Sequence, residues 1–233
     1  MDDLNPASLV DLHARVLFAH DGLDDITGLN ESAGGPGPLV YLGRSSSRVA
    51  LRFSPAVQLP AREAVRAFAA TLPPWRPRSP EASLVERLAS AAGLPPHAEA
   101  WAGPVFRFPP PVFPPMGAME LYPVHARLLH PELATLGPSL SRRRPAFTVI
   151  RGGQAVSVCY SSRSTANAAE AGVETVAAFR GQGCAGLAVT AWADAVRRAG
   201  RLPFYSTSWE NAASLAVAAK LDLIEFGEDI HLT

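Results

Sequence analysis

The sequence is poor in cysteine and in lysine, and it carries no net charge. The 233 residues include only two cysteines, Cys159 and Cys184. Nothing else points to an oxidising compartment, so we expect two reduced thiols. Lysine occurs once, at Lys220, which we attribute to codon composition. With 21 basic and 21 acidic residues the formal charge is +0 at pH 7, so no overall field attracts nucleic acid or an anionic membrane.

Long apolar runs are also missing. Proline, glycine or a charged residue interrupts each apolar stretch well before it reaches the length of a bilayer span. The chain opens with acids in MDDLNPASLVDL rather than with a basic segment. We therefore expect a soluble, cytoplasmic protein with no membrane or nucleic-acid partner. The hydrophobic content of 48% is typical of a globular chain, and the length suffices for one large domain or two small ones.

The N-terminal half predicts helices and a hairpin but no chemistry. Asn5 and Pro6 mark a helix start, and further helices are expected over residues 61–72 and 80–92. Residues 39–53 predict two short strands joined by a turn. The histidines of this half are His13, His20, His97, His125 and His130. They lack the paired spacing of a metal site, so we expect no bound metal.

From Ala146 onward the pattern becomes that of strands. AFTVI and QAVSVCY flank Gly152–Gly153, which predicts a hairpin, and a third strand is expected over residues 170–177. It runs into FRGQGCAGLAVTAWADAVRRAG, residues 179–200, which predicts a turn and then a helix ending at Gly200. The buried stripe of that helix is predicted as Ala188, Trp192, Ala195 and Ala199.

Glycines at the start of this helix predict an anion site. Gly181 and Gly183 remove side chains where unpaired N–H groups emerge, so a phosphate can approach the positive end of the helix dipole. A tight connection without a ligand is the alternative. With Gly186 the spacing also fits GxGxxG, and Glu210 follows at a suitable distance, which would indicate NAD(P) and an oxidoreductase. The motif comes too late in the chain for a doubly wound sheet.

Two motifs in this half carry a family resemblance. RGQGCA, Arg180–Ala185, matches the R/Q-x-x-G-x-G/A signature of the GCN5-related N-acetyltransferase (GNAT) superfamily. The later segment PFYSTSWENAASLAVAAKLDL resembles the next strand and helix of that family, with Asn211, Ser214 and KLDL at the corresponding places. The resemblance extends from Ala146 to Thr233.

The resemblance implies an α/β (α+β) fold. Residues 141–233 would form the acetyl-CoA-binding domain, a mixed, mostly antiparallel sheet flanked by helices. Residues 1–140 would form an α+β domain that either covers the substrate side or is a degenerate second copy of the fold. The segment SRRRP, residues 141–145, is then a solvated connection or a contact for the 3′-phosphate of coenzyme A.

The implied activity is transfer of an acetyl group from acetyl-CoA to a primary amine by direct attack, without a metal. Backbone N–H groups of the loop would hold the pyrophosphate beside Arg180, and the pantetheine arm would bond to the third strand. The residues expected to contact acetyl-CoA are Thr175, Val176, Arg180, Gly181, Gln182, Gly183, Cys184, Ala185, Asn211 and Ser214.

Glu170 and Glu174 are the candidate bases for the amine proton. Alternation along a strand puts both on one face with Gly172, and neighbouring, partly buried carboxylates are expected to have raised pKa values. The alternative is that one of the two glutamates is an exposed charge at the end of the strand and that the other forms an ion pair with an arginine.

The sequence departs from the family where a tyrosine usually protonates the leaving thiolate, because that position is Ala218. Ser214, Tyr205 or water would have to replace it. An acyl-cysteine mechanism at Cys184 is a weaker alternative, because its side chain is expected to point away from the thioester.

Two further hypotheses concern function and assembly. The missing tyrosine is also consistent with an acyl-CoA-binding regulatory or sensor module without turnover. The acceptor amine is not identified by the sequence. The last strand, LIEFGEDIHL, is a candidate for pairing across a homodimer.

Overall fold

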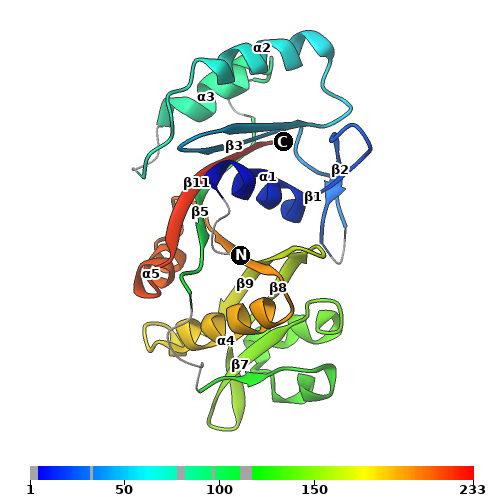
Figure 1. Cartoon of the computed structure of the whole chain (residues 1–233). Coiled ribbons are helices and arrows are strands. Elements are labelled where there is room, and N and C mark those ends of the chain that lie inside the picture. The colour runs from blue at the N-terminus through cyan, green and yellow to red at the C-terminus, as the bar shows by residue number, and fades with distance from the viewer. Residues whose placement is uncertain (1–4, 32–33, 78–81, 96–97, 111–116) are drawn as a thin grey trace. The chain divides into compact units, whose positions relative to one another are not determined.

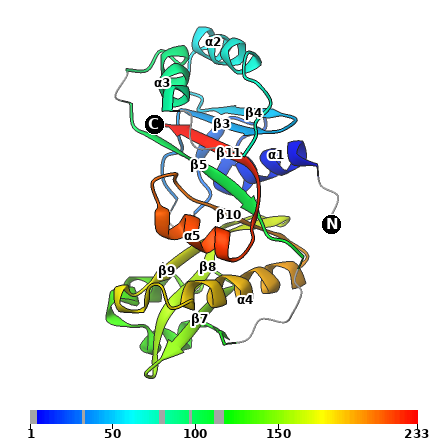
Figure 2. The ribbon, with the colours of Figure 1, turned by 90° about the vertical axis from the view of Figure 1, so that its left-hand side faces the viewer.

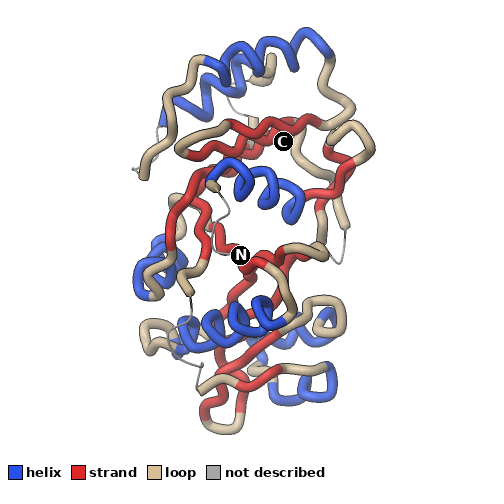
Figure 3. The backbone as a smooth tube through the Cα atoms, viewed as in Figure 1, coloured by secondary structure: helices blue, strands red, loops and turns tan. Residues whose placement is uncertain are grey.

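The computed structural model describes residues 5–31, 34–77, 82–95, 98–110 and 117–233. The chain is an α/β protein of mostly antiparallel strands flanked by helices, as predicted (Figure 1, Figure 3). It divides into two compact units. Unit 1 comprises Met1–Phe106, Ser206–Ala212 and Glu225–Thr233, and unit 2 comprises Arg107–Tyr205 and Ala213–Ile224. The division into residues 1–140 and 141–233, which follows chain order, stays a prediction.

Helix α1 (Pro6–Leu17) begins where the sequence predicted a helix start. The Asn5 side chain accepts a 2.9 Å hydrogen bond from the backbone N–H of Ser8, and Pro6 takes the first helical position. A short antiparallel pair of strands follows, β1 (Phe18–His20) and β2 (Ile26–Leu29).

The sheet of unit 1 joins segments from both ends of the chain. Its strand order is β4-β3-β11-β5, with β3 antiparallel to β4 and β11. The strands are β3 (Val40–Ser45), β4 (Val49–Phe53), β5 (Ala100–Arg107) and β11 (Ile224–Leu232). Because β11 lies between β3 and β5, its edges are taken by strands of its own chain. The predicted pairing of this strand across a dimer is therefore wrong, and a dimer formed in another way stays a prediction.

Helices α2 (Leu59–Ala70) and α3 (Ala82–Ala91) cover one face of this sheet, and both lie close to their predicted positions. The expected start of the second of these helices, at residue 80, lies outside the described residues, as does His97. Burial of each larger apolar side chain here contributes about 1.5–3 kcal/mol. The shared core consists of Val40, Leu42, Phe53, Val65, Ala69, Leu84, Leu88, Ala89, Ala92, Ile230 and Leu232.

Asp229 on β11 is the centre of a buried polar cluster in unit 1. The residue has 0% exposure, its Oδ2 lies 2.8 Å from Nδ1 of His13, and its Oδ1 accepts a 2.8 Å hydrogen bond from Tyr41. Burial alone would raise the pKa of Asp229, but His13 and then His231 outweigh it and hold the pKa well below its usual range. The cluster thus ties α1 and β3 to β11.

The pKa of Glu225, at the start of β11, is shifted in the opposite direction. Its Oε1 is buried and has no hydrogen-bond partner among the described residues. Burial first, and then repulsion by Glu228, raises the pKa of Glu225 from 4.5 to about 7. The folded protein binds this proton more tightly than the unfolded chain does. The contribution of Glu225 to stability therefore falls as the pH rises from 4.5 to about 7.

We expect Glu225→Gln to raise the free energy of unfolding by about 1–2 kcal/mol at pH 8 and to change it little at pH 4. This expected change is smaller than the full pKa shift would give, because the Glu225 side chain is only half-buried and solvent screens its charge. Urea denaturation of parent and variant at both pH values measures the difference. Glu86→Gln, at an exposed position of α3, is the matched control and should have no effect. Equal destabilisation by Glu225→Gln at both pH values would contradict this account.

Unit 2 contains a second run of strands in the order β10-β9-β8-β7-β6. Neighbours are antiparallel except β9 and β10, which are parallel. Gly152–Gly153 forms the predicted turn between β7 and β8. The strands are β6 (Met119–Glu120), β7 (Ala146–Arg151), β8 (Gln154–Ser164), β9 (Ala168–Thr175) and β10 (Leu202–Ser206). The 3₁₀ helices are η1 (Pro123–Leu128), η2 (Pro131–Ser139) and η3 (Ala177–Phe179).

Helix α4 (Cys184–Arg198) covers β7, β8 and β9 (Figure 2). Trp192 is fully buried, and its Nε1–H donates a 3.1 Å hydrogen bond to Oγ of Ser161 on β8. The predicted stripe is wrong at two positions, because Ala195 is only half-buried and Ala199 is exposed. The buried side chains are Cys184, Ala188, Val189, Ala191, Trp192, Ala193 and Val196. Helix α5 (Ala212–Lys220) lies between β10 and β11 in the chain.

Candidate active site

The loop before α4 has a backbone conformation that exposes N–H groups. Gly181 and Gly183 adopt φ angles of +74° and +79°, which glycine tolerates without strain. Gly183 is the N-cap residue; among the described residues no side chain caps the helix, and its first turn contains no acid. The first N–H groups of α4 are therefore available to a ligand, and the helix dipole favours an anion there.

Two basic side chains lie beside this loop. Arg180 is exposed, and its Nε–H donates a 3.2 Å hydrogen bond to the backbone carbonyl of Thr175. Lys220 ends α5, and its Nζ would lie 3.6 Å from a Cβ placed on Gly183. Sequence reasoning missed Lys220 as a site residue, because only the fold brings the end of α5 close to Gly183. Both charges suit an anionic ligand.

The other predicted loop residues differ in exposure. Gln182 is exposed, and its amide donates a 2.9 Å hydrogen bond to the carbonyl of Ala178. Cys184 is 1% exposed, and both cysteines are unbridged, as predicted. A thiol buried beneath the helix is poorly placed to attack a ligand on the loop, so the acyl-cysteine alternative gains no support. Ala185 is half-buried in the first turn.

The edge of β9 that faces β10 is paired only in its first part. The parallel register joins Ala168–Glu170 to Leu202–Phe204 and goes no further, whereas β9 continues to Thr175. The two strands therefore separate beyond Glu170. In the described part of unit 2, the second half of β9 has no partner strand on this side.

Hydrogen bonds of Val176 show which main-chain groups face this open edge. The N–H of Val176 donates a 2.9 Å hydrogen bond to the backbone carbonyl of Val156 in β8, and the Val176 carbonyl accepts a 2.9 Å hydrogen bond from the N–H of Phe179. Backbone groups alternate between the two edges of an antiparallel strand, so those of Val173 and Thr175 point away from β8. An extended ligand would meet Val173 and Thr175, whereas at Val176 it would have to replace existing bonds.

Glu174 lies on the opposite face of the sheet from α4, next to Tyr160 of β8. The Tyr160 hydroxyl donates a 2.9 Å hydrogen bond to Oε1 of Glu174. The Tyr160 ring lies against Gly172. A Cβ added at Gly172 would approach the ring to 2.6 Å, so only glycine allows this contact. Burial, and then the Glu174 charge, raises the pKa of Tyr160, which therefore stays a neutral donor.

The second predicted base, Glu170, is in a different environment. It is 3% exposed and pairs with Phe204 at the last position of the parallel ladder, while Oγ of Ser162 donates a 3.1 Å hydrogen bond to its backbone carbonyl. Glu174 is half-buried and so is the more accessible carboxylate. The structure does not bring the two into a shared, paired site, although both remain candidates.

Tyr205, the residue after the last β9–β10 pair, is 2% exposed. Its hydroxyl donates a 3.4 Å hydrogen bond to the backbone carbonyl of Ser214 in α5, and burial raises its pKa to about 12. Ala218 lies one turn further along the same face of α5 and is buried.

Asn211 is exposed directly before α5, and its N–H donates a hydrogen bond to the carbonyl of Ser208. Its contact with acetyl-CoA stays a prediction.

Comparisons with known proteins agree with this geometry. A family model described as GNAT acetyltransferase matches residues 144–225, which include the loop, α4, β10 and α5. This part of the chain belongs to the GNAT family. Acyl transfer is the general chemistry of that family. No curated protein matches the chain.

Three solved structures illustrate the GNAT likeness. An acetyltransferase from the GNAT family of Colwellia psychrerythraea has a TM-score of 0.50 at 13% identity, with coverage of 78% of this chain and 75% of its own. A GNAT-family protein from Novosphingobium aromaticivorans (TM-score 0.47, 18% identity) covers 57% of this chain, which spans 64% of that protein. A tandem GNAT protein from the clavulanic acid biosynthesis pathway (TM-score 0.42, 16% identity) covers 96% of this chain and 87% of its own. The similarity to the first structure supports the fold alone, and the other two structures are too dissimilar to support a conclusion.

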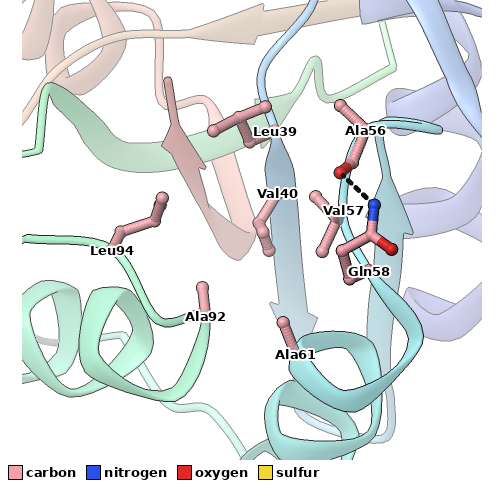
Figure 4. Close-up of a pocket in the computed structure, with 8 residues that line it drawn as sticks. All are labelled: Leu39, Val40, Ala56, Val57, Gln58, Ala61, Ala92 and Leu94. Atoms are coloured by element: carbon pink, nitrogen blue, oxygen red, sulfur yellow. Dashed lines mark hydrogen bonds between the residues drawn. The ribbon is translucent and has the colours of Figure 1, made fainter.

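A separate pocket of about 210 Å³ lies in unit 1, between the start of β3, the start of α2 and the residues that follow α3 (Figure 4). Gln58 is its single polar side chain, and the Gln58 amide is bonded to the carbonyl of Ala56. Within the described ranges no cluster of three or more His, Cys, Asp or Glu residues is arranged to hold a metal ion. The same ranges contain no helix long and apolar enough to cross a bilayer.

Proposed function

We propose that unit 2 transfers an acetyl group from acetyl-CoA to a primary amine. The observation that carries the proposal is an uncapped, glycine-initiated helix next to a strand edge without a partner. The helix start suits a pyrophosphate, and the open edge suits the amide groups of the pantetheine arm, which can pair with main chain as an added strand does.

The arm would replace a bond that the protein now makes with itself. Arg180 donates to the Thr175 carbonyl, and this carbonyl lies on the edge where the arm would pair. On binding, the arm would take the carbonyl of Thr175, and the Arg180 guanidinium would turn to the pyrophosphate. Lys220 would add a second cation at Gly183.

In the transfer step the amine nitrogen attacks the thioester carbonyl, so a C–N bond forms and the C–S bond breaks. Glu174 would take the amine proton, because its Oε1 already accepts from Tyr160 and its Oε2 accepts no hydrogen bond from the described residues. Tyr205 would protonate the thiolate. Its pKa of about 12 keeps the phenol protonated, and its hydroxyl lies one turn from Ala218 on α5.

An acyl-CoA-binding module without turnover is the second candidate. The observation that favours it is Ala218, which stands where the family usually has its proton-donating tyrosine. Binding of acetyl-CoA is common to both candidates, and release of thiol in the presence of an amine separates them.

We expect calorimetric titration with acetyl-CoA to give saturable binding that Arg180→Glu weakens by about 10-fold to 100-fold, the effect of losing a charge-assisted contact. Arg198→Glu makes the same charge change at the other end of α4, where Arg198 is exposed and pairs with Asp194. This control should bind as the parent does. No heat of binding by the folded parent at millimolar acetyl-CoA would rule out both candidates.

A further inference from the structure

Arg143 lies beside Tyr160, the hydrogen-bond partner of the proposed base Glu174. Its guanidinium lies over the Tyr160 ring, 4.6 Å from the ring centroid, and the Tyr160 hydroxyl bonds to Glu174. The segment that carries Arg143 is held on the sheet, because the backbone carbonyl of Arg143 accepts a 3.1 Å hydrogen bond from the N–H of Ser161. One aromatic ring thus holds a cation over its face and an anion at its hydroxyl.

The neighbouring arginines behave differently. Arg144 is paired with Glu120 at 2.8 Å and lies over the Tyr122 ring, and Arg142 is exposed. Arg143 is half-buried, and no ion pair joins it to a carboxylate among the described residues. A guanidinium in this position presents a fork of N–H donors that matches a carboxylate.

We propose that the acceptor carries a carboxylate as well as its primary amine, with α-amino acids as the simplest members of the class. This inference rests on the proposed acetyl transfer. The carboxylate binds Arg143 and the amine reaches Oε2 of Glu174, with Tyr160 between them. An amine without a carboxylate leaves the Arg143 charge unpaired and places its own positive charge near it, so it binds less well.

Matched acceptors test this. Each of the twenty amino acids is offered with acetyl-CoA beside its carboxamide and its decarboxylated amine, with β-alanine and γ-aminobutyrate as longer forms. Release of coenzyme A thiol gives kcat/KM for each. We expect kcat/KM for an amino acid that is an acceptor to exceed kcat/KM for its carboxamide and for its decarboxylated amine by at least about 10-fold. This ratio corresponds to the loss of one charge-assisted contact.

Variants assign the preference to one residue. Arg143→Ala should bring the ratio of acid to amide close to one, mainly through KM, while Arg143→Lys should keep part of it. Arg142→Ala is the matched control and should keep the whole ratio. The Kd for acetyl-CoA should be unchanged in all three.

Three outcomes would overturn the inference, and each differs from failure of the proposed function. Amides or amines used as well as the acids would do so, as would transfer to amines without a carboxylate but to no carboxylate-bearing amine. Weaker acetyl-CoA binding by Arg143→Ala, with an unchanged acceptor ratio, would place Arg143 at the 3′-phosphate instead. Absence of acetyl-CoA binding by the parent, or binding without transfer to any amine, would instead remove the proposed function itself.

Discussion

Glu174→Gln is expected to lower kcat for acetyl transfer by about 10²-fold to 10⁴-fold, the usual contribution of a general base. Glutamine keeps an oxygen that can accept from the Tyr160 hydroxyl, so the variant should fold as the parent does, but it cannot take a proton from the amine. The measurement is thiol release at saturating acetyl-CoA with the acceptor that the matched panel identifies.

The control for this change is Glu132→Gln. Glu132 is another acid of unit 2, and its Oε2 accepts a 3.2 Å hydrogen bond from the backbone N–H of Ala177, just beyond β9. This variant should retain parental kcat. If Glu174→Gln also kept kcat within about threefold of the parent, a general-base role would be contradicted. The buried Glu170 would then be the next residue to test.

Asp229→Ala is expected to lower the free energy of unfolding by about 3–5 kcal/mol, because it removes the ion-pair partner of a fully buried His13 and the hydrogen-bond acceptor of Tyr41. Urea denaturation at neutral pH measures the loss. Arg15→Ala is the comparison, since Arg15 of α1 pairs with Asp24 through side chains that are 49% and 47% exposed. That variant should cost less than about 1 kcal/mol.

The pH dependence of the same cluster has a definite sign. The pKa of Asp229 in the folded protein lies below its ordinary value of 3.8, so its stabilising contribution is present above that value and is lost as the pH falls further. The difference between parent and Asp229→Ala should therefore shrink in strong acid. A difference below about 1 kcal/mol at neutral pH would show that the cluster contributes little to stability.

Local signals in the sequence predicted much of the fold. Asn5–Pro6, Gly152–Gly153 and Gly200 act through their own backbone geometry or through a capping bond a few residues away, so their effect is visible without tertiary structure. The glycine loop before α4 is of the same kind. Its two positive φ angles are conformations that glycine adopts readily.

Features that depend on distant segments were missed. The pairing of β11 with β3 joins residues up to 192 positions apart, as in the register of Leu232 with Val40, and no local sequence pattern predicts it. The buried stripe of α4 also differs from the predicted one, because small alanines give a weak apolar signal. Val196 rather than Ala199 lies on the inner face.

The contact between Tyr160 and Glu174 depends on strand register. Tyr160 and Glu174 become diagonal neighbours because Tyr160 pairs with Gly172 and Val158 pairs with Glu174. A shift of one residue would put Glu174 on the face that α4 covers. The sequence could propose Glu174 as a base by alternation, but it could not show that Tyr160 and Arg143 surround it.

Amide hydrogen exchange with and without acetyl-CoA tests the central claim most directly. Acetyl-CoA should slow exchange at the N–H groups of Val173 and Thr175 on the open edge of β9, and at those of residues 182–185 where α4 begins. The N–H of Val176 is already bonded to Val156 and should change little. Protection confined to other segments, or none under saturating acetyl-CoA, would contradict the assignment of this loop and strand edge as the acetyl-CoA site.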